Sequence, residues 1–488
     1  MASSSSSAAA VRASWRWSAL VVLCAGVLMI ILDQTIVNVA LPFIQSDLRF
    51  SQSGLAWVVN AYLIAFGGIL LLAGRLGDLI GRKRMFISGL TVFTAASLLC
   101  GLSESRWLLI AARFVQGVGG AMSSAVTLGM IVTMFSEPRE QAKAIGIYSF
   151  IASAGASIGL LAGGVLTQAI NWHWIFFVNL PIGIAAGVLS LRLVESDAGI
   201  GLGGGADVAG AFLVTASLML GVYTIVQTGE YGWGSAHTLG FGVAASLLLA
   251  AFVARQATAA NPLLPLHMFR SRNVSGANLI QFLMVAGLLG FFFLSTLYLR
   301  QVLGLHPLAI GLAFLPIAVA IGTLSLGWSP RLITRLGARV VLVAGLVLIA
   351  SGLALLTRAP VDSGYVVDLL PGMLLLGVGA GVSFPALMTL GMSGATPSDS
   401  GLASGLLNTT AQVGGALGLA VLATLAASRT DGLLSSGETT ASALTGGYRL
   451  AFGIGAGLVV AAIVTAVTVL RPATTVNTAE ARNQSEAA

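Results

Sequence analysis

Two residues of opposite charge stand out because each lies deep inside an apolar stretch. Asp33 is part of LDQTIVNVALP (Leu32 to Pro42), and Arg113 opens RFVQGVGGA (Arg113 to Ala121). Ionisable groups inside a bilayer are costly and mark functional sites. At about 1.5 Å of rise per residue, both lie roughly 8 to 9 Å below the same edge of a bilayer core. The two side chains are therefore predicted to share one level.

A carboxylate beside a guanidinium is held in its charged form by the opposite charge, while desolvation favours the neutral form. Small changes of hydration then move a proton on or off the carboxylate. We therefore hypothesise that Asp33 exchanges the coupling proton and that Arg113 is its partner, both facing a water-accessible chamber between two helix bundles. A permanently ionised structural pair is the alternative.

The elements that must position this pair follow from composition. Of 488 residues, 57% are hydrophobic and 8% are charged, whereas a soluble domain carries about 25% charged residues. A helix crosses a bilayer core with about 20 apolar residues, and fourteen such stretches are found. They are expected to begin near Ser18, Leu55, Met85, Trp107, Ile145, Trp174, Asp207, Leu239, Ser275, Leu308, Ala338, Val366, Gly401 and Leu450.

The predicted fold is an all-α membrane protein of two six-helix bundles, residues 18–194 and 273–471. An inserted helix pair with flanking loops, residues 195–272, separates the bundles, and residues 1–17 and 472–488 are expected to be disordered tails. Most Lys and Arg residues lie on one side when the N-terminus is placed in the cytoplasm. Both termini are thus predicted to be cytoplasmic, in a multi-pass protein of the plasma (inner) membrane.

An internal repeat supports two like-oriented bundles. GRLGDLIGRK (Gly74 to Lys83) aligns on PRLITRLGAR (Pro330 to Arg339) without gaps, in loops expected after the predicted helices that begin near Leu55 and Leu308. Contacts of such loops can latch two bundles and release them when the bundles rock; the alternative is a basic loop that only sets topology. The residues assigned to this conformational gating are Gly74, Asp78, Gly81, Arg82, Arg335 and Gly337.

Small and polar residues suggest two further roles. Gly155, Gly159, Gly163 and Gly164 leave one face of helix 5, the predicted helix that begins near Ile145, as bare backbone suited to close packing against another helix. Polar residues within helices are candidates to line a central substrate cavity, although they can equally be packed amides. They are Asn38, Gln116, Asn278, Gln281 and Asn408.

Several kinds of chemistry lack their motifs. The sequence has no GxxxxGK[ST] element, so the energy source is expected to be a proton gradient rather than ATP, with no cofactor. It has no HExxH or G-x-S-x-G motif, and we predict no metal site and no enzyme activity. GIGLGG (Gly199 to Gly204) follows no soluble strand and is interpreted as a flexible linker. No basic cluster with interleaved aromatics indicates nucleic acid.

Five segments in this order resemble the signatures of the fourteen-spanner drug:proton antiporters of the major facilitator superfamily, from about Leu32 to Val421. They are LDQTIVNVALP, GRLGDLIGRKR, RFVQGVGGA, GASIGLLAGG followed by NWHWIFFVNLPIG, and GLASGLLNTTAQVGGALG. The resemblance implies a major facilitator fold, alternating access, proton antiport and export of lipophilic compounds, including antibiotics. It also implies that Asp33 and Arg113 serve coupling, that Asp78 and Arg82 act in gating, and that the helix 5 glycines form the antiporter helix.

The predicted function is therefore a proton-coupled exporter of small lipophilic drugs, working as a monomer in contact with membrane lipid. A single deep carboxylate allows a cationic substrate without requiring one. The same scaffold can also import a nutrient or move a lipid or metabolite, and the direction of flux separates these. A polytopic enzyme would need clustered catalytic groups and a sensor would need a soluble output domain, and the sequence indicates neither.

Overall fold

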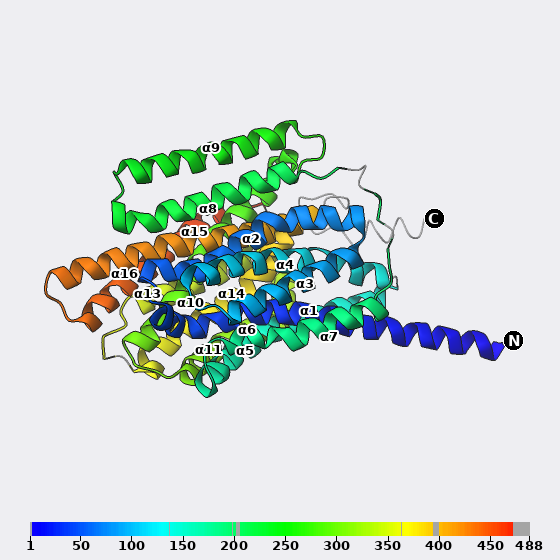
Figure 1. Cartoon of the computed structure of the whole chain (residues 1–488), viewed down its shortest axis with the longest axis horizontal. Helices are drawn as coiled ribbons and strands as arrows, with labels where there is room; N and C mark the ends of the chain where they lie inside the picture. The colour runs from blue at the N-terminus through cyan, green and yellow to red at the C-terminus, as the bar shows by residue number, and fades with distance from the viewer. Residues whose placement is uncertain are drawn as a thin grey trace.

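A computed structural model describes residues 2–135, 137–197, 199–201, 205–362, 364–393 and 400–471, and every regular element in these ranges is a helix. The first bundle, here the N-half, comprises α1 (Ala2–Leu48), α2 (Gln52–Ile80), α3 (Arg82–Gly101), α4 (Arg106–Met134), α5 (Pro138–Ala169), α6 (Trp174–Phe177) and α7 (Asn179–Leu193). The inserted pair is α8 (Val208–Tyr231) and α9 (Ala236–Thr258). It lies along one edge of the bundle (Figure 1).

The second bundle, the C-half, follows the 3₁₀ turn η2 (Leu266–Arg270). It comprises α10 (Arg272–Gln301), α11 (Pro307–Thr323), the π-helical η3 (Leu324–Trp328), α12 (Ser329–Leu336), α13 (Ala338–Leu356), the π-helical η4 (Tyr365–Leu369), α14 (Leu370–Met392), α15 (Ser400–Ser435) and α16 (Thr440–Thr468). Within the described ranges, 14 helical spans are long and apolar enough to cross a membrane. This confirms the predicted number of spans.

The two halves repeat one packing scheme. In the N-half α1 packs on α5 and α7, α3 on α4 and α7, and α2 on α4. In the C-half α10 packs on α15 and α16, α13 on α14 and α16, and α11 on α14. Between the halves, α2 meets α15 and α5 meets α11, which are also equivalent pairs. Equivalent helices with equivalent neighbours are what two parallel repeats produce.

The repeated motif has the same geometry in both halves. Gly81 and Gly337 both have left-handed backbone, with φ +102° and +84°, and each makes the turn into the next helix. Two residues later, Lys83 Nζ donates to Leu191 O near the end of α7, and Arg339 Nε donates to Ala466 O near the end of α16. A cation at a helix C-terminus satisfies unpaired carbonyls and the helix dipole. The structure thus supports the sequence alignment at both positions.

The boundaries differ from the sequence interpretation in two places. The motif segments before Gly81 and Gly337 are not loops, since they form the last turns of α2 and α12. The first helix begins at Ala2, within the expected disordered tail, although its apolar span runs from Trp15 to Leu48. The predicted tail 472–488 lies outside the described residues. We call the end of the molecule where α1 begins the terminal end, and the opposite end the far end.

Candidate functional site

Asp33 and Arg113 form the centre of a buried polar cluster. Arg113 Nη1 lies 2.6 Å from Asp33 Oδ2, and their side chains are 2% and 0% exposed. The prediction that helices 1 and 4 place the two at one level is therefore confirmed by direct contact. Arg113 Nε also donates to Val58 O at 3.0 Å, which ties the guanidinium to the backbone of α2.

Three neutral side chains complete the cluster. Gln116, one turn below Arg113 on α4, accepts from Arg113 Nη1 at 2.6 Å and donates to Asp33 Oδ1 at 2.8 Å. Asn179, the first residue of α7, donates to Asp33 Oδ1 at 2.9 Å. Ser97 on α3 accepts from Gln116 Nε2 at 2.8 Å. Both carboxylate oxygens of Asp33 are thus satisfied by donors, as a buried charge requires.

Aromatic rings enclose the guanidinium. Arg113 Cζ lies 4.4 Å from the centre of the Tyr62 ring and 5.8 Å from that of Phe176. Cation–π contact of this kind stabilises a desolvated guanidinium by about 2 kcal/mol. The Tyr62 hydroxyl in turn accepts from Gln34 Nε2 at 3.4 Å. Since Gln34 is partly exposed, it connects the enclosed cluster to the outside of the N-half.

The Asp33–Arg113 pair is surrounded by helices of the N-half and does not lie in the expected chamber between the bundles. The groups that contact Asp33 and Arg113 come from α2, α4, α6 and α7, all within the N-half. The prediction that both residues face a chamber between the bundles is therefore wrong for this conformation. The reason is packing: Arg113, Gln116 and Asn179 donate to both oxygens of the carboxylate, which lets neighbouring helices close over it.

Sequence reasoning missed Asn179, Ser97 and Tyr62. Asn179 lies in NWHWIFFVNLPIG, a segment that the sequence links to the family but to no site, and the break between α6 and α7 places it at a helix start. Gln116 was assigned to the substrate cavity, but it is fully buried and bonded inside the cluster. A Gln three residues after an intramembrane Arg, on the same face of one helix, is the signal that could have placed it here.

The other predicted cavity residues differ in their partners and burial. Asn278 donates to Val274 O on its own helix and accepts from Thr410 Oγ1 at 2.8 Å, so it is a packed amide of the C-half. Asn38 donates to Gln34 O on its own helix at 3.3 Å. Gln281 is buried, with 8% exposed, whereas Asn408 is exposed on α15.

The glycines of α5 bring that helix against the helix that carries Asp33. A Cβ on Gly159 would lie 2.9 Å from Leu32 O, and one on Gly163 would lie 2.6 Å from Ile36 O. Gly155 faces Leu28 and Ile31 of α1. Gly164 points elsewhere, because a Cβ there would lie 2.8 Å from Pro307 O in the C-half. The predicted close packing is therefore present, with α1 as the partner of three of the four glycines.

The predicted gating residues lie at the terminal end. Asp78 and Arg82 form an ion pair of 2.9 Å, and Gly81 makes the turn between their helices. Gly74 lies inside α2. A Cβ added there would lie 4.0 Å from Ala125 Cβ, so Gly74 is not needed for a close helix contact. Arg335 and Gly337 are exposed on the C-half.

The segment after α7 docks on this turn. Asp197 accepts from the backbone of Arg82 at 2.8 Å and of Lys83 at 3.2 Å. Ile200 N donates to Asp78 O and Gly201 N to Leu79 O, both at 3.0 Å. Ile200 and Gly201, predicted to belong to a flexible linker, are therefore hydrogen-bonded to the last turn of α2, next to the Asp78–Arg82 pair.

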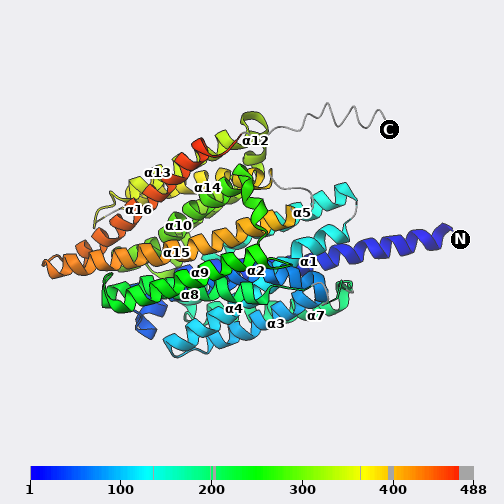
Figure 2. The same ribbon diagram turned by 90° about the horizontal axis from the view of Figure 1, so that it is seen from above.

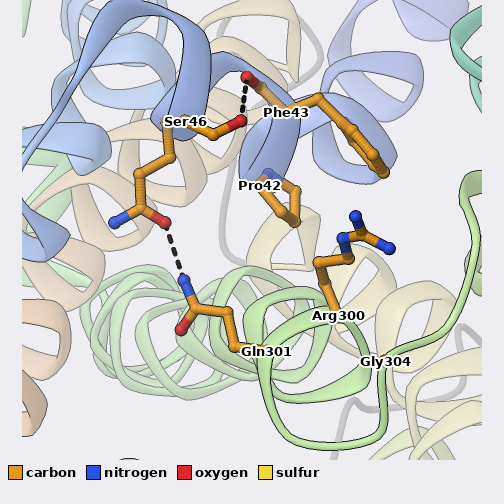
Figure 3. Close-up of a pocket in the computed structure, with 7 residues that line it drawn as sticks. Pro42, Phe43, Ser46, Arg300, Gln301 and Gly304 are labelled. Carbon is orange, nitrogen blue, oxygen red and sulfur yellow. Dashed lines mark hydrogen bonds between the residues drawn. The ribbon is translucent and has the colours of Figure 1, made fainter.

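The two halves close against each other at the far end. Gln301 Nε2 of α10 donates to Gln45 Oε1 of α1 at 2.8 Å, and Arg300 lies over the Phe43 ring at 4.9 Å. These residues border a cavity of about 550 Å³ between the ends of α1 and α10, shown in Figure 3. Neither Asp33 nor Arg113 lines this cavity. The polar cluster is thus separate from the far-end surface.

Comparisons with known proteins agree with this architecture. The family model described as Major Facilitator Superfamily matches residues 23–419. Two solved structures share the fold. One is a bacterial homologue of the human lysosomal transporter Spinster, inward-facing and unoccupied, with a TM-score of 0.66 and 15% identity over 93% of this chain and 98% of that one. The other is an autoinhibited POT family peptide transporter, with a TM-score of 0.68 and 16% identity over 94% of this chain and 98% of that one. The chain belongs to the Major Facilitator Superfamily and is a multi-pass membrane transporter, not an enzyme.

Several of its curated relatives are named for resistance or export. The chain is 37% identical over 456 residues to the puromycin resistance protein pur8 of Streptomyces alboniger, covering 92% of this chain and 90% of that protein. It is 38% identical over 417 residues to the cephamycin export protein CmcT of Amycolatopsis lactamdurans, covering 85% and 86%. It is 35% identical over 412 residues to the lincomycin resistance protein of Streptomyces lincolnensis, covering 84% and 85%.

Proposed function

We propose that this protein is a proton-coupled exporter of lipophilic drugs or antibiotics, working by alternating access with both termini in the cytoplasm. The names of the relatives support export of a small antibiotic. The observation that carries proton coupling is the enclosed Asp33–Arg113 pair, at 2.6 Å and almost without exposure. Arg16, Arg75, Arg82 and Arg339 at the terminal end support the orientation.

The pair responds to a proton in a way that a conformational change can use. When a proton binds an Asp33 oxygen, the carboxyl becomes neutral and its attraction for Arg113 is lost. Arg113 is then a buried charge without a counter-charge, a state that costs about 3 to 5 kcal/mol. A conformation that hydrates Arg113 becomes favoured, and the proton leaves when the pair re-forms. Gln34 and Tyr62 mark the route by which the site meets water.

The antiporter helix connects this change to the interface between the halves. Because α5 rests on α1 through Gly155, Gly159 and Gly163, a shift of α1 at Asp33 moves α5. The same helix reaches the C-half through Gly164. Protonation in the N-half can thereby alter the contact between α5 and α11.

The test is reconstitution in liposomes with an imposed pH gradient, with puromycin, lincomycin and ethidium as separate substrates. We expect the substrate to accumulate against its gradient as protons leave in exchange. Asp33→Asn should abolish gradient-driven accumulation, and Asp33→Glu should keep part of it. Asp431→Asn, an exposed carboxylate on α15, serves as the matched control and should transport normally. Full gradient-driven transport by Asp33→Asn would refute proton coupling at this site.

A further inference from the structure

Two equivalent seams join the halves, α2 with α15 and α5 with α11. If the halves rocked symmetrically, both seams would part at the same end of the molecule. In the structure the two seams differ at the terminal end. Figure 2 shows α12, which continues α11, displaced from the N-half, while α15 runs beside α2.

The α5–α11 seam is held at the far end. A Cβ on Gly311 would lie 2.6 Å from Leu160 O, and Leu308 N donates to Gln168 Oε1 at 3.2 Å. Towards the terminal end each helix turns to its own half. Gln141 of α5 donates to Val132 O of α4, and Ser329 of α12 donates to Val382 O of α14.

The α2–α15 seam is closed along its length. Leu63 lies against Gly415 near the middle, and a Cβ on Gly67 would lie 2.9 Å from Gln412 Cβ. Nearer the terminal end, a Cβ on Gly405 would again lie 2.9 Å from Leu71 Cδ2. This seam therefore stays shut at the end where the other seam is parted.

The inserted pair covers the closed seam. Helix α8 packs against both α2 and α15. Gly68 of α2 makes room for Thr215 of α8, and Leu72 of α2 clusters with Ala211 of α8 and Leu263 after α9. Arg75 Nε donates to Gly205 O just before α8. The pair is thus attached to the N-half almost to the terminal end.

The segment after α9, residues 259–271, crosses from one half to the other, and we call it the strap. Leu263 packs in the N-half cluster with Leu72, whereas Leu264 and Met268 pack with Ala403 and Leu406 of α15. Neighbouring residues of one short segment therefore pack against opposite halves. A segment anchored in this way limits how far the two halves can separate beside it.

A network of hydrogen bonds centred on Asp207 and Gln256 fixes the strap to the inserted pair. Asp207, buried at the start of α8, accepts from Arg255 Nε and from Gln256 Nε2 at the end of α9. Gln256 Oε1 accepts from Leu264 N of the strap at 3.0 Å. Gly210 N also donates to Asp207 Oδ1 at 2.9 Å. These bonds hold the strap against both helices of the pair.

We propose that the inserted pair and its strap make the α2–α15 seam the hinge of this transporter, so that the halves part on the α5–α11 side.

The first experiment locks each seam separately in the full chain. Leu71→Cys with Gly405→Cys places two thiols across the hinge seam, since replacing Leu71 removes the atoms nearest Gly405. Gln168→Cys with Leu308→Cys does so across the other seam. After oxidation we expect the first variant to keep at least about half of its puromycin transport in liposomes. The puromycin transport of the second variant should fall by more than about tenfold and recover when the disulfide is reduced. The parent chain, whose Cys24 and Cys100 are buried, is the oxidation control.

Equal loss of transport in both oxidised variants, reversed by reduction, would overturn the hinge. A second measurement judges the hinge without transport. Spin labels at Arg139 and Thr334 span the α5–α12 side, and labels at Arg84 and Leu402 span the α2–α15 side; all four positions are exposed. When the pH is changed and when puromycin is added, the distance distribution between the labels at Arg139 and Thr334 should broaden or shift by several ångströms. The distribution between Arg84 and Leu402 should stay constant. A change of equal size in both distances would also overturn the proposal.

The strap has its own test. In the Leu71–Gly405 cysteine pair, adding Asp207→Ala should slow disulfide formation about fivefold because the seam loosens. Adding Glu230→Ala, on the exposed far end of α8, should leave the rate unchanged. If the parent shows no gradient-driven transport but the spin-label distances behave as expected, the proposed function fails and the hinge stands. An unchanged cross-linking rate in Asp207→Ala would remove the strap from the hinge.

Discussion

The N-half and the C-half pack their helices in the same pairs but bury different chemistry. Among the residues that the structure describes, the buried side chains that carry a charge at neutral pH are Asp33 and Arg113 in the N-half and Asp207 beside the inserted pair. The described C-half buries only neutral polar groups, such as Asn278 and Ser383. A buried charge is sensitive to protonation and a buried amide is not. If the protein is proton-coupled as proposed, the comparison predicts that the coupling group lies in the N-half.

The largest difference between the halves is expected for their arginines. Arg113→Met leaves the Asp33 carboxylate buried without a counter-charge and should destabilise the protein by about 3 to 5 kcal/mol. Arg339→Met removes a partly exposed cation at the end of α16 and should cost less than about 1 kcal/mol. Thermal unfolding in detergent measures both. Recovery of most of the stability in Asp33→Leu/Arg113→Met would confirm the pairing, whereas equal losses in the two single variants would contradict the comparison.

The glycine lines test whether equal packing has unequal consequences. Gly159 of α5 faces α1, and Gly418 of α15 faces the backbone of Ala286 on α10. Gly159→Val and Gly418→Val should each destabilise by about 1 to 3 kcal/mol through overpacking. Only Gly159→Val should also uncouple proton release from substrate transport, because it displaces the helix that carries Asp33. Proton and substrate fluxes recorded together in liposomes give the answer, and uncoupling in both variants would count against an N-half site.

Two buried amides sharpen the comparison further. Asn179→Leu removes a donor to a charged carboxylate, an interaction of about 1.5 to 3 kcal/mol, and should reduce the coupled rate by about tenfold or more. Asn278→Leu removes a neutral bond to Thr410, of about 0.5 to 1.5 kcal/mol, and should leave the number of protons per substrate unchanged. Initial rates and the proton-to-substrate ratio are the measurements. A changed ratio in Asn278→Leu would extend coupling into the C-half.

The smallest effect is expected for acid pH at the terminal end. Burial raises the pKa of Asp197, but hydrogen bonds from the backbone of Arg82 and Lys83 outweigh it, so the pKa lies below its ordinary value. Because the pKa of Asp197 is lower in the folded protein than in the unfolded chain, the stability that its carboxylate contributes is complete above the ordinary pKa. That contribution is lost as pH falls through the pKa of the folded protein. Asp197→Asn should therefore cost less than about 1 kcal/mol at pH 7 and nothing at the acid limit. Unfolding curves from pH 3 to 8 test this, and a loss that grew towards acid pH would contradict it.

Much of the site followed from depth and residue type. Asp33 and Arg113 are isolated charges in apolar helices, and the rise per residue was enough to place them at one level. Residues such as Ser97 and Asn179 could not be chosen in this way, because uncharged polar residues are tolerated at many membrane positions. Their role depends on which face of each helix turns towards Asp33, and that is set by packing among four helices.

The sequence alone determined the membrane class, the fourteen spans, the repeated motif with Gly81 and Gly337, and the charged pair. These are local properties, since hydropathy, left-handed glycine turns and isolated charges need no neighbour to be recognised. Only the tertiary structure decided that the pair is enclosed within the N-half, that the glycines of α5 face α1, and that the strap joins the halves beside α2 and α15. Such contacts link residues far apart in the chain, and their energy depends on how side chains fit, which no local pattern records.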